Sequence, residues 1–109
     1  MKTQNKVQLI GYIGNEPEMK MLGDGIKMAR FRVATDHRSK SVEGEWLQHT
    51  TWHDVIAWNA IAQIAVEKFS KGSHILVEGF IVYRTFEDVS GQTRYFTQIH
   101  AQHFLNLDR

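Results

Sequence analysis

The sequence of 109 residues contains no cysteine, which excludes a disulfide bond and a thiolate metal site. This composition fits a reducing cytoplasm, but a protein without cysteine tolerates an oxidising compartment as well. The sequence also lacks an apolar run long enough to span a bilayer, and its first residues lack the apolar stretch of a signal peptide. We therefore expect a cytoplasmic protein that makes no contact with a membrane.

The net charge is also small, at +1 with the histidines neutral. The charges are unevenly distributed, because residues 27–40 contain five basic residues and a single acidic one. The five basic residues are Lys27, Arg30, Arg32, Arg38 and Lys40. A basic stripe on a nearly neutral protein is compatible with phosphate binding, although a solvated strand face would look the same in the sequence.

Hydrophobic residues make up 42% of the sequence, which can fill the core of one domain over residues 1–109. Alternating apolar positions predict a first strand over residues 7–13 and a second strand from Ile26. In the second strand Arg30 and Arg32 alternate with apolar side chains, so the basic stripe faces away from the core. The polar residues 37–45 are interpreted as a flexible connection.

A third strand is predicted over residues 48–58, and apolar residues at 3-4 spacing predict an amphipathic helix directly after it. Asn59 is a candidate cap for the start of this helix, and Gly72 is a candidate stop. A fourth strand over residues 74–87 and a fifth over residues 92–104 complete the chain. Three strands, a helix and two further strands are the layout of the OB-fold, an all-β, five-stranded Greek-key barrel.

The last two predicted strands form a hairpin that is too long to pack along its whole length, so we expect it to project. If Ser90-Gly91 form its turn, Glu87 faces Arg94 and Phe86 faces Tyr95. The first is a favourable charge pair and the second a favourable aromatic pair. A projecting hairpin of this kind can grip a strand of polymer.

Two tryptophans, Trp52 and Trp58, lie six residues apart in the third predicted strand and therefore on one face, about 20 Å from each other. A row of flat rings suits a polymer with several flat groups to stack, namely single-stranded nucleic acid. The candidate stacking residues are Trp46, Trp52, Trp58 and Phe86, and the candidate phosphate-binding residues are Arg30, Arg32, Arg38, Lys40, Arg84 and Arg94. On composition alone, Trp52 and Trp58 could equally be core or subunit-interface residues.

The six histidines do not form a pattern typical of a metal site. His49 and His53 share a strand face but would stand about 13 Å apart, and His100 and His103 face opposite ways on a strand. A nucleophile motif, a phosphate loop and a paired-carboxylate pattern are all missing from the sequence. We expect no metal, no cofactor and no enzymatic activity, and we interpret Asp54 as a spacer or a salt-bridge partner.

The sequence resembles the bacterial single-stranded DNA-binding proteins over residues 5–104. The resemblance rests on an ordered set of motifs: Asn5-Lys6-Val7, Leu9-Ile10-Gly11-Tyr12-Ile13-Gly14, Pro17-Glu18, Ala34-Thr35, Gly44-Glu45, Thr51-Trp52-His53-Asp54-Val55, Lys71-Gly72-Ser73, Val77-Glu78-Gly79 and Gly91-Gln92-Thr93-Arg94-Tyr95. It implies an OB-fold subunit, usually in a homotetramer, that coats single-stranded DNA during replication, recombination and repair. A nucleoid-associated location in the cytoplasm follows from that role.

The resemblance also implies roles for particular residues. The family's stacking tryptophan falls on Trp52, its second aromatic on Trp58, and the aromatic of the fourth-strand arm on Phe86. The histidine after the stacking tryptophan lies at the family's subunit interface, which makes His53 an interface candidate. The aromatic residue that the family often has after the second strand has no counterpart here. We place Trp46 in the connection that follows. We expect Trp46 either to take over part of the role of the missing aromatic or to be merely an exposed ring.

Two basic positions of the family are replaced, by Ala60 at the helix start and by Val82 in the arm, which implies weaker or less salt-dependent DNA binding. The family's acidic C-terminal tail, which recruits other proteins, is absent from the sequence. We therefore expect either a shortened chain or a tailless paralogue, and tail-mediated partners are doubtful. The alternative function is an adaptor on the same fold, such as a replication-restart protein.

Overall fold

The computed structural model describes residues 2–109, which form six strands and one helix. In chain order the elements are β1 (Val7–Ile13), β2 (Glu18–Leu22), β3 (Ile26–Lys40), β4 (Trp46–Trp58), α1 (Asn59–Lys68), β5 (His74–Glu87) and β6 (Thr93–Asn106). Within residues 2–109, no helix is long and apolar enough to cross a membrane.

Five of the strands close into a barrel. The strand order in the sheet is β1-β5-β6-β4-β3-β2, and an additional pairing of β1 with β3 closes the ring while β2 extends the sheet beyond β3. The pairing of β4 with β6 is parallel and short, and the other pairings are antiparallel. A closed five-stranded barrel with a helix between β4 and β5 confirms the predicted OB-fold.

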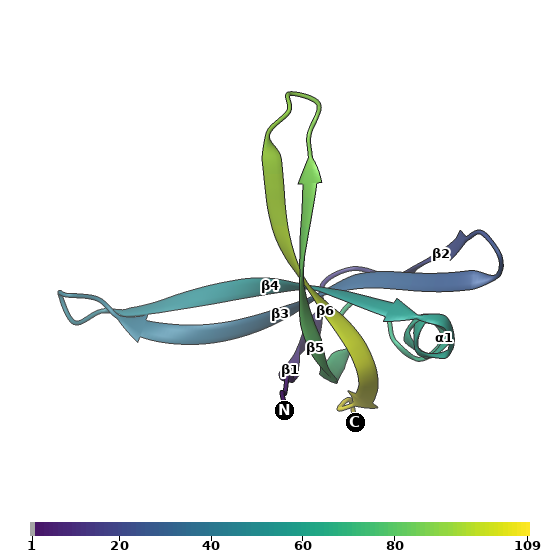
Figure 1. The fold of residues 1–109 in the computed structure, drawn as a ribbon. Helices are drawn as coiled ribbons and strands as arrows, with labels where there is room; N and C mark the ends of the chain where they lie inside the picture. The colour runs from purple at the N-terminus through teal and green to yellow at the C-terminus, as the bar shows by residue number, and fades with distance from the viewer. Residues whose placement is uncertain (1) are drawn as a thin grey trace.

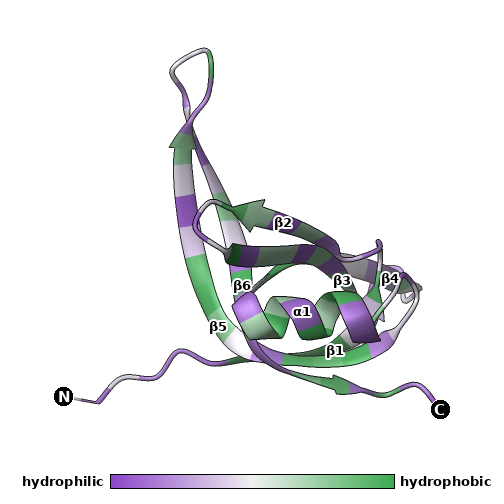
Figure 2. Ribbon diagram, turned by 90° about the vertical axis from the view of Figure 1, so that its right-hand side faces the viewer, coloured by the Kyte–Doolittle hydropathy of each residue, from purple (hydrophilic) through white to green (hydrophobic). Residues whose placement is uncertain are grey.

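The core fills the barrel with the apolar side chains of alternating strand positions. Its largest fully buried side chains are Phe31, Ile75, Val33, Val55 and Val77. Burying one such side chain contributes roughly 1.5–3 kcal/mol to the free energy of folding. The helix α1 lies between β3 and β1 in Figure 2 and adds Ala62 and Ala65 to the core. The inward positions of β3 predicted from the sequence are confirmed.

Two long hairpins and one short one project from the barrel in different directions (Figure 1). One long hairpin is formed by β3 and β4, which pair without interruption from Met28 opposite Trp58 to Lys40 opposite Trp46. The prediction of a flexible connection over residues 37–45 was wrong, because only the loop at residues 41–45 separates the strands. Both faces of this arm are exposed, so its sequence lacks the alternation that reveals a half-buried strand.

The β5–β6 hairpin has a register that differs by one residue from the predicted one. Phe86 pairs with Arg94 and Glu87 pairs with Thr93. The Asp88 N–H donates to the Gln92 carbonyl, which closes a loop of three residues rather than two. Gly91 ends this loop with φ of 83°, a left-handed conformation that glycine adopts without strain.

Three further expectations were wrong at element boundaries. β2 was not predicted, because Met19 is its only half-buried side chain and the other four are exposed. Asn59 does not cap the helix, since its side-chain oxygen accepts a hydrogen bond from the Lys27 N–H at 3.1 Å and no side chain caps the helix start. The helix ends at Lys68, and Gly72 instead donates its N–H to the Ile13 carbonyl in the turn before β5.

Candidate nucleic-acid interface

Strand alternation and cross-strand register place aromatic and basic side chains from four strands on one outer surface of the sheet. We name this surface the aromatic face. Its members on the barrel and along the β5–β6 arm are Met28, Arg30, Arg32, Trp52, Asp54, Ile56, Trp58, Phe80, Arg84, Phe86, Arg94, Phe96, Gln98 and His100. The predicted pair Trp52 and Trp58 thus shares a face, together with Phe86, Arg84 and the two arginines of β3.

Trp52 is held by two neighbours and remains 48% exposed. The guanidinium of Arg32 lies 5.2 Å from the centre of its ring. Gly14 lies so close to the indole that a Cβ atom there would stand 2.2 Å from the ring atom Cζ3. Glycine at position 14 therefore leaves room for the indole to lie close to the backbone, while about half of Trp52 remains exposed to solvent.

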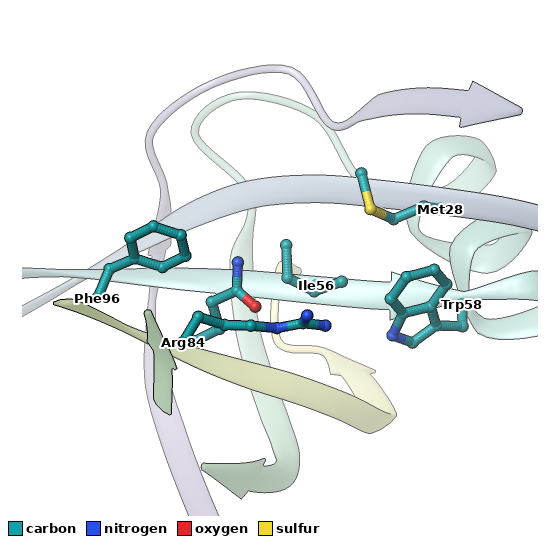
Figure 3. Close-up of a pocket in the computed structure, with 6 residues that line it drawn as sticks. Met28, Ile56, Trp58, Arg84 and Phe96 are labelled. Carbon is teal, nitrogen blue, oxygen red and sulfur yellow. The ribbon is translucent and has the colours of Figure 1, made fainter. Parts of the chain in front are cut away.

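Trp58 is half-buried and forms one wall of a pocket of about 230 Å³ (Figure 3). The residues that line the pocket are Met28, Ile56, Trp58, Arg84, Phe96 and Gln98. The indole N–H donates to Nδ1 of His100 at 3.4 Å, which satisfies its only polar group. Trp58 is therefore fixed in position and presents a ring face beside the pocket.

The arm carries a second aromatic pair. Phe86 and Phe96 lie with ring centroids 5.3 Å apart in a tilted arrangement, and Phe86 is 48% exposed. Arg84 lies opposite Phe96 in the ladder. Arg94 pairs with the loop, because its Nε donates to the Asp88 carboxylate at 2.8 Å, and its side chain remains more than half exposed. Asp88, and not the predicted Glu87, is therefore the partner of Arg94.

The basic stripe of β3 is partly neutralised by Asp54 of β4. The Asp54 carboxylate lies 3.6 Å from Nη2 of Arg30 and 4.0 Å from Nε of Arg32. This geometry confirms Asp54 as a salt-bridge partner. Both arginine side chains remain more than half exposed, so they can still reach a phosphate.

The same strand positions continue along the β3–β4 arm. Arg38 lies opposite Gln48, and Lys40 lies opposite Trp46, where its ammonium stands 5.8 Å from the ring centre. Trp46 is 65% exposed and begins β4, so its predicted place in a connection was wrong. The arm therefore carries an exposed aromatic ring and two cations outside the barrel.

His53 lies on the opposite face of β4 from Trp52. Its Nε2 is 2.8 Å from the Thr35 hydroxyl, and burial lowers the pKa of its imidazole.

A separate outer surface, across β1, β5 and β6, carries a row of three neighbouring apolar side chains, Ile10, Leu76 and Leu105. Ile10 is 54% exposed and Leu105 is 56% exposed, so this row has no cover within residues 2–109.

Sequence reasoning missed Met28, Phe96, Gln98 and His100, which all contribute to the aromatic face. The alternation of Arg94, Phe96 and Gln98 in the last strand places these three side chains on one face and could have revealed two of the missed residues. Met28 and His100 could not be found in this way, because only the register across β3, β4 and β6 brings them beside Trp58. Within residues 2–109, no group of three or more potential ligands is placed to hold a metal ion.

Comparison with known proteins gives consistent results. The family model described as "Single-strand binding protein family" matches residues 4–107. Single-stranded DNA-binding protein 1 of Chlorobaculum tepidum is 34% identical over 96 residues, which cover 87% of this chain and 59% of that protein. The chain thus spans about three fifths of the length of this curated relative. Both names describe binding to single strands.

A solved structure described as a Plasmodium falciparum SSB complex with ssDNA superposes with a TM-score of 0.91 at 28% sequence identity. The match covers 99% of this chain and 98% of that chain. It agrees with the OB-fold assignment, and the family match covers every residue that builds the aromatic face. The chain therefore belongs to the single-strand binding protein family.

Proposed function

We propose that this protein binds and coats single-stranded DNA without requiring a defined sequence, in replication, recombination and repair. The observation that carries the proposal is the aromatic face, in which exposed rings alternate with arginines across four adjacent strands. Family membership and the ssDNA-bound structural neighbour support it. They do not favour a tailless adaptor, because both relatives are described by their single-stranded DNA binding or ligand.

In this proposal residues 1–109 act as one DNA-binding domain in the nucleoid-associated cytoplasm. Bases stack on Trp52, Trp58 and Phe86, with Trp46 as a further platform on the β3–β4 arm. Each stacked base contributes about 1–3 kcal/mol and tolerates any sequence, because every base has a flat face. Phosphates are bound by the cations that border these rings, namely Arg30, Arg32, Arg38, Lys40, Arg84 and Arg94.

Fluorescence anisotropy with labelled oligonucleotides tests the proposal. A single strand of thymidines should bind at low salt, and a duplex of the same length should bind far more weakly, because duplex bases are already stacked on each other. The logarithm of the affinity for the single strand should fall with the logarithm of the salt concentration by roughly 0.7 per phosphate contacted. Equal affinity for duplex and single strand would contradict the proposal.

We further propose that the protein assembles into a homotetramer. The uncovered apolar row of Ile10, Leu76 and Leu105 supports self-association, since an exposed apolar patch on a sheet marks an interaction surface. His53 is the candidate interface residue on β4. Light scattering at micromolar concentration should give four times the chain mass, and Leu105→Glu should reduce that mass. A monomer mass for the unmodified protein would contradict the proposal.

A further inference from the structure

The pocket beside Trp58 combines apolar walls with two polar side chains. Four of its six lining residues are apolar, namely Met28, Ile56, Trp58 and Phe96, and the remaining two are Arg84 and Gln98. In Figure 3 the side chain of Arg84 runs along the sheet toward Trp58, and Phe96 lies at the opposite end from Trp58. A pocket with an aromatic ring at each end and polar side chains in its lining has the character of a site for a planar heterocycle rather than for a phosphate alone.

The polar groups that the pocket offers are hydrogen-bond donors. Arg84 can only donate, and within residues 2–109 no carboxylate lies within ion-pair distance of its guanidinium. The orientation of the Gln98 amide follows from a chain of bonds that starts at Trp58. The indole N–H can only donate, so Nδ1 of a neutral His100 must accept, and the imidazole proton lies on Nε2.

This tautomer decides which end of Gln98 is free. The Nε2–H of His100 donates to Oε1 of Gln98 at 3.4 Å. The carbonyl oxygen of Gln98 is therefore engaged by the protein, and its amide nitrogen is left to donate to a ligand. Donors from Arg84 and Gln98 thus meet at one pocket, and no acceptor of comparable strength stands among its lining side chains.

We propose that this pocket takes one nucleobase of the bound strand with its pyrimidine C4 or purine C6 edge toward the donors, and favours bases with a carbonyl group at that position over those with an amine there. At that position guanine, thymine and uracil offer a carbonyl oxygen to the donors, whereas adenine and cytosine carry an amine that would face the donors and leave them unsatisfied. The inference rests on the proposed single-stranded DNA binding. It adds a dependence on base composition to a surface whose stacking contacts accept any base.

The test compares deoxyuridine and deoxycytidine oligonucleotides of equal length at pH 8, where cytosine is unprotonated. The two bases share the pyrimidine ring and differ in the 4-keto or 4-amino group. We expect the unmodified protein to bind the uridine strand about five- to tenfold more tightly, at the lower end of the discrimination given by one good base contact. Arg84→Met and Gln98→Leu should each reduce this ratio toward one.

Two further variants separate base recognition from other roles. Arg84→Lys keeps the charge but loses the planar fork, so it should lower the ratio while leaving the salt dependence nearly unchanged. Trp52→Ala removes a ring outside the pocket and should weaken binding to both strands by the same factor, leaving the ratio intact. A variant with a merely structural defect would likewise weaken both strands equally.

The possible outcomes distinguish the two proposals. Binding of both strands at equal affinity by the unmodified protein would overturn the base pocket and leave single-stranded DNA binding in place. A preference for uridine that persists in both Arg84→Met and Gln98→Leu would also overturn it, because the preference would then arise elsewhere. Failure to bind either strand at low salt would overturn the proposed function itself.

Discussion

At the scale of single residues, Trp52 and Trp58 are held by different neighbours and should respond differently to substitution. Trp52 is about half exposed and rests against Gly14 and Arg32. Trp58 is half-buried and hydrogen-bonded to His100. Loss of the Trp52 ring should therefore affect binding more than stability, whereas loss of the Trp58 ring should affect both.

Substitution of Gly14 tests the position of the Trp52 ring. Trp52→Ala should weaken binding of a thymidine oligonucleotide by about 1–3 kcal/mol with little change in melting temperature. Gly14→Ala should also weaken binding, because the new methyl group overlaps the indole and displaces it. In the double variant, Gly14→Ala should add no further loss, since the ring on which it acts is gone. Additive losses measured by titration would show that Gly14 acts by another route.

His100 should make stability depend on pH. Burial, and to a smaller extent the charge of Arg84, lowers the pKa of His100 in the folded protein below its usual value of 6.5. The unfolded chain therefore binds the proton more readily, and stability is full above pH 6.5 and falls as the pH drops below it. His53, whose pKa burial also lowers, acts in the same direction.

Thermal unfolding between pH 7.5 and 5.5 measures this effect. The melting temperature should fall as the pH decreases, His100→Gln should make the decrease shallower, and His53→Gln combined with it should make the curve shallower still. An unchanged slope in the double variant would mean that neither histidine is responsible.

At the scale of elements, the sequence predicts the strands that have one buried face. In β3 the inward Ala29, Phe31 and Val33 alternate with outward arginines, so this part was predicted correctly. The outer end of β3, over residues 37–40, and the first two residues of β4 were not, because both faces of the arm are exposed there and the strands are held by pairing with each other rather than by a core. The register of the β5–β6 hairpin depends on the hydrogen bonds of Asp88, and the alternation of apolar and polar residues cannot predict such bonds.

Asp88 holds the loop of the β5–β6 hairpin together. The Asp88 carboxylate accepts hydrogen bonds from the Ser90 hydroxyl and from the N–H groups of Ser90 and Gln92, and it pairs with Arg94. The Ser90 and Arg94 hydrogen bonds are the main reason why its pKa lies below the ordinary value for aspartate. The arm tip should therefore keep its loop at mildly acidic pH.

Hydrogen exchange of the backbone amides near the arm tip should distinguish Asp88 from its neighbour. Asp88→Ala should speed exchange there and weaken DNA binding by loosening Phe86. Glu87→Ala removes the same charge next to it and should leave exchange unchanged, because the Glu87 carboxylate is not hydrogen-bonded in the loop. Faster exchange in Glu87→Ala but not in Asp88→Ala would contradict the role of Asp88 and would support the pairing of Glu87 with Arg94 that the sequence predicted.

At the scale of the whole molecule, the aromatic face exists only because the barrel aligns strands that are distant in the sequence. The resemblance to a known family identified its rings, and the alternation of β3 identified the outward arginines. The pocket beside Trp58 could not be predicted, because it joins Met28 of β3 to Arg84 of β5 through register and barrel closure. The partial neutralisation of Arg30 and Arg32 by Asp54 likewise depends on which residues face each other across β3 and β4.

The measurement that tests the stacking of bases most directly is tryptophan fluorescence during titration with poly(dT). Trp46, Trp52 and Trp58 occupy equivalent alternating positions of β4, so bases that stack along this strand should quench most of the emission. We predict strong, saturable quenching at low salt, reduced in amplitude by Trp52→Phe and by Trp58→Phe. Fluorescence that stays unchanged across the full titration at low salt would contradict the account.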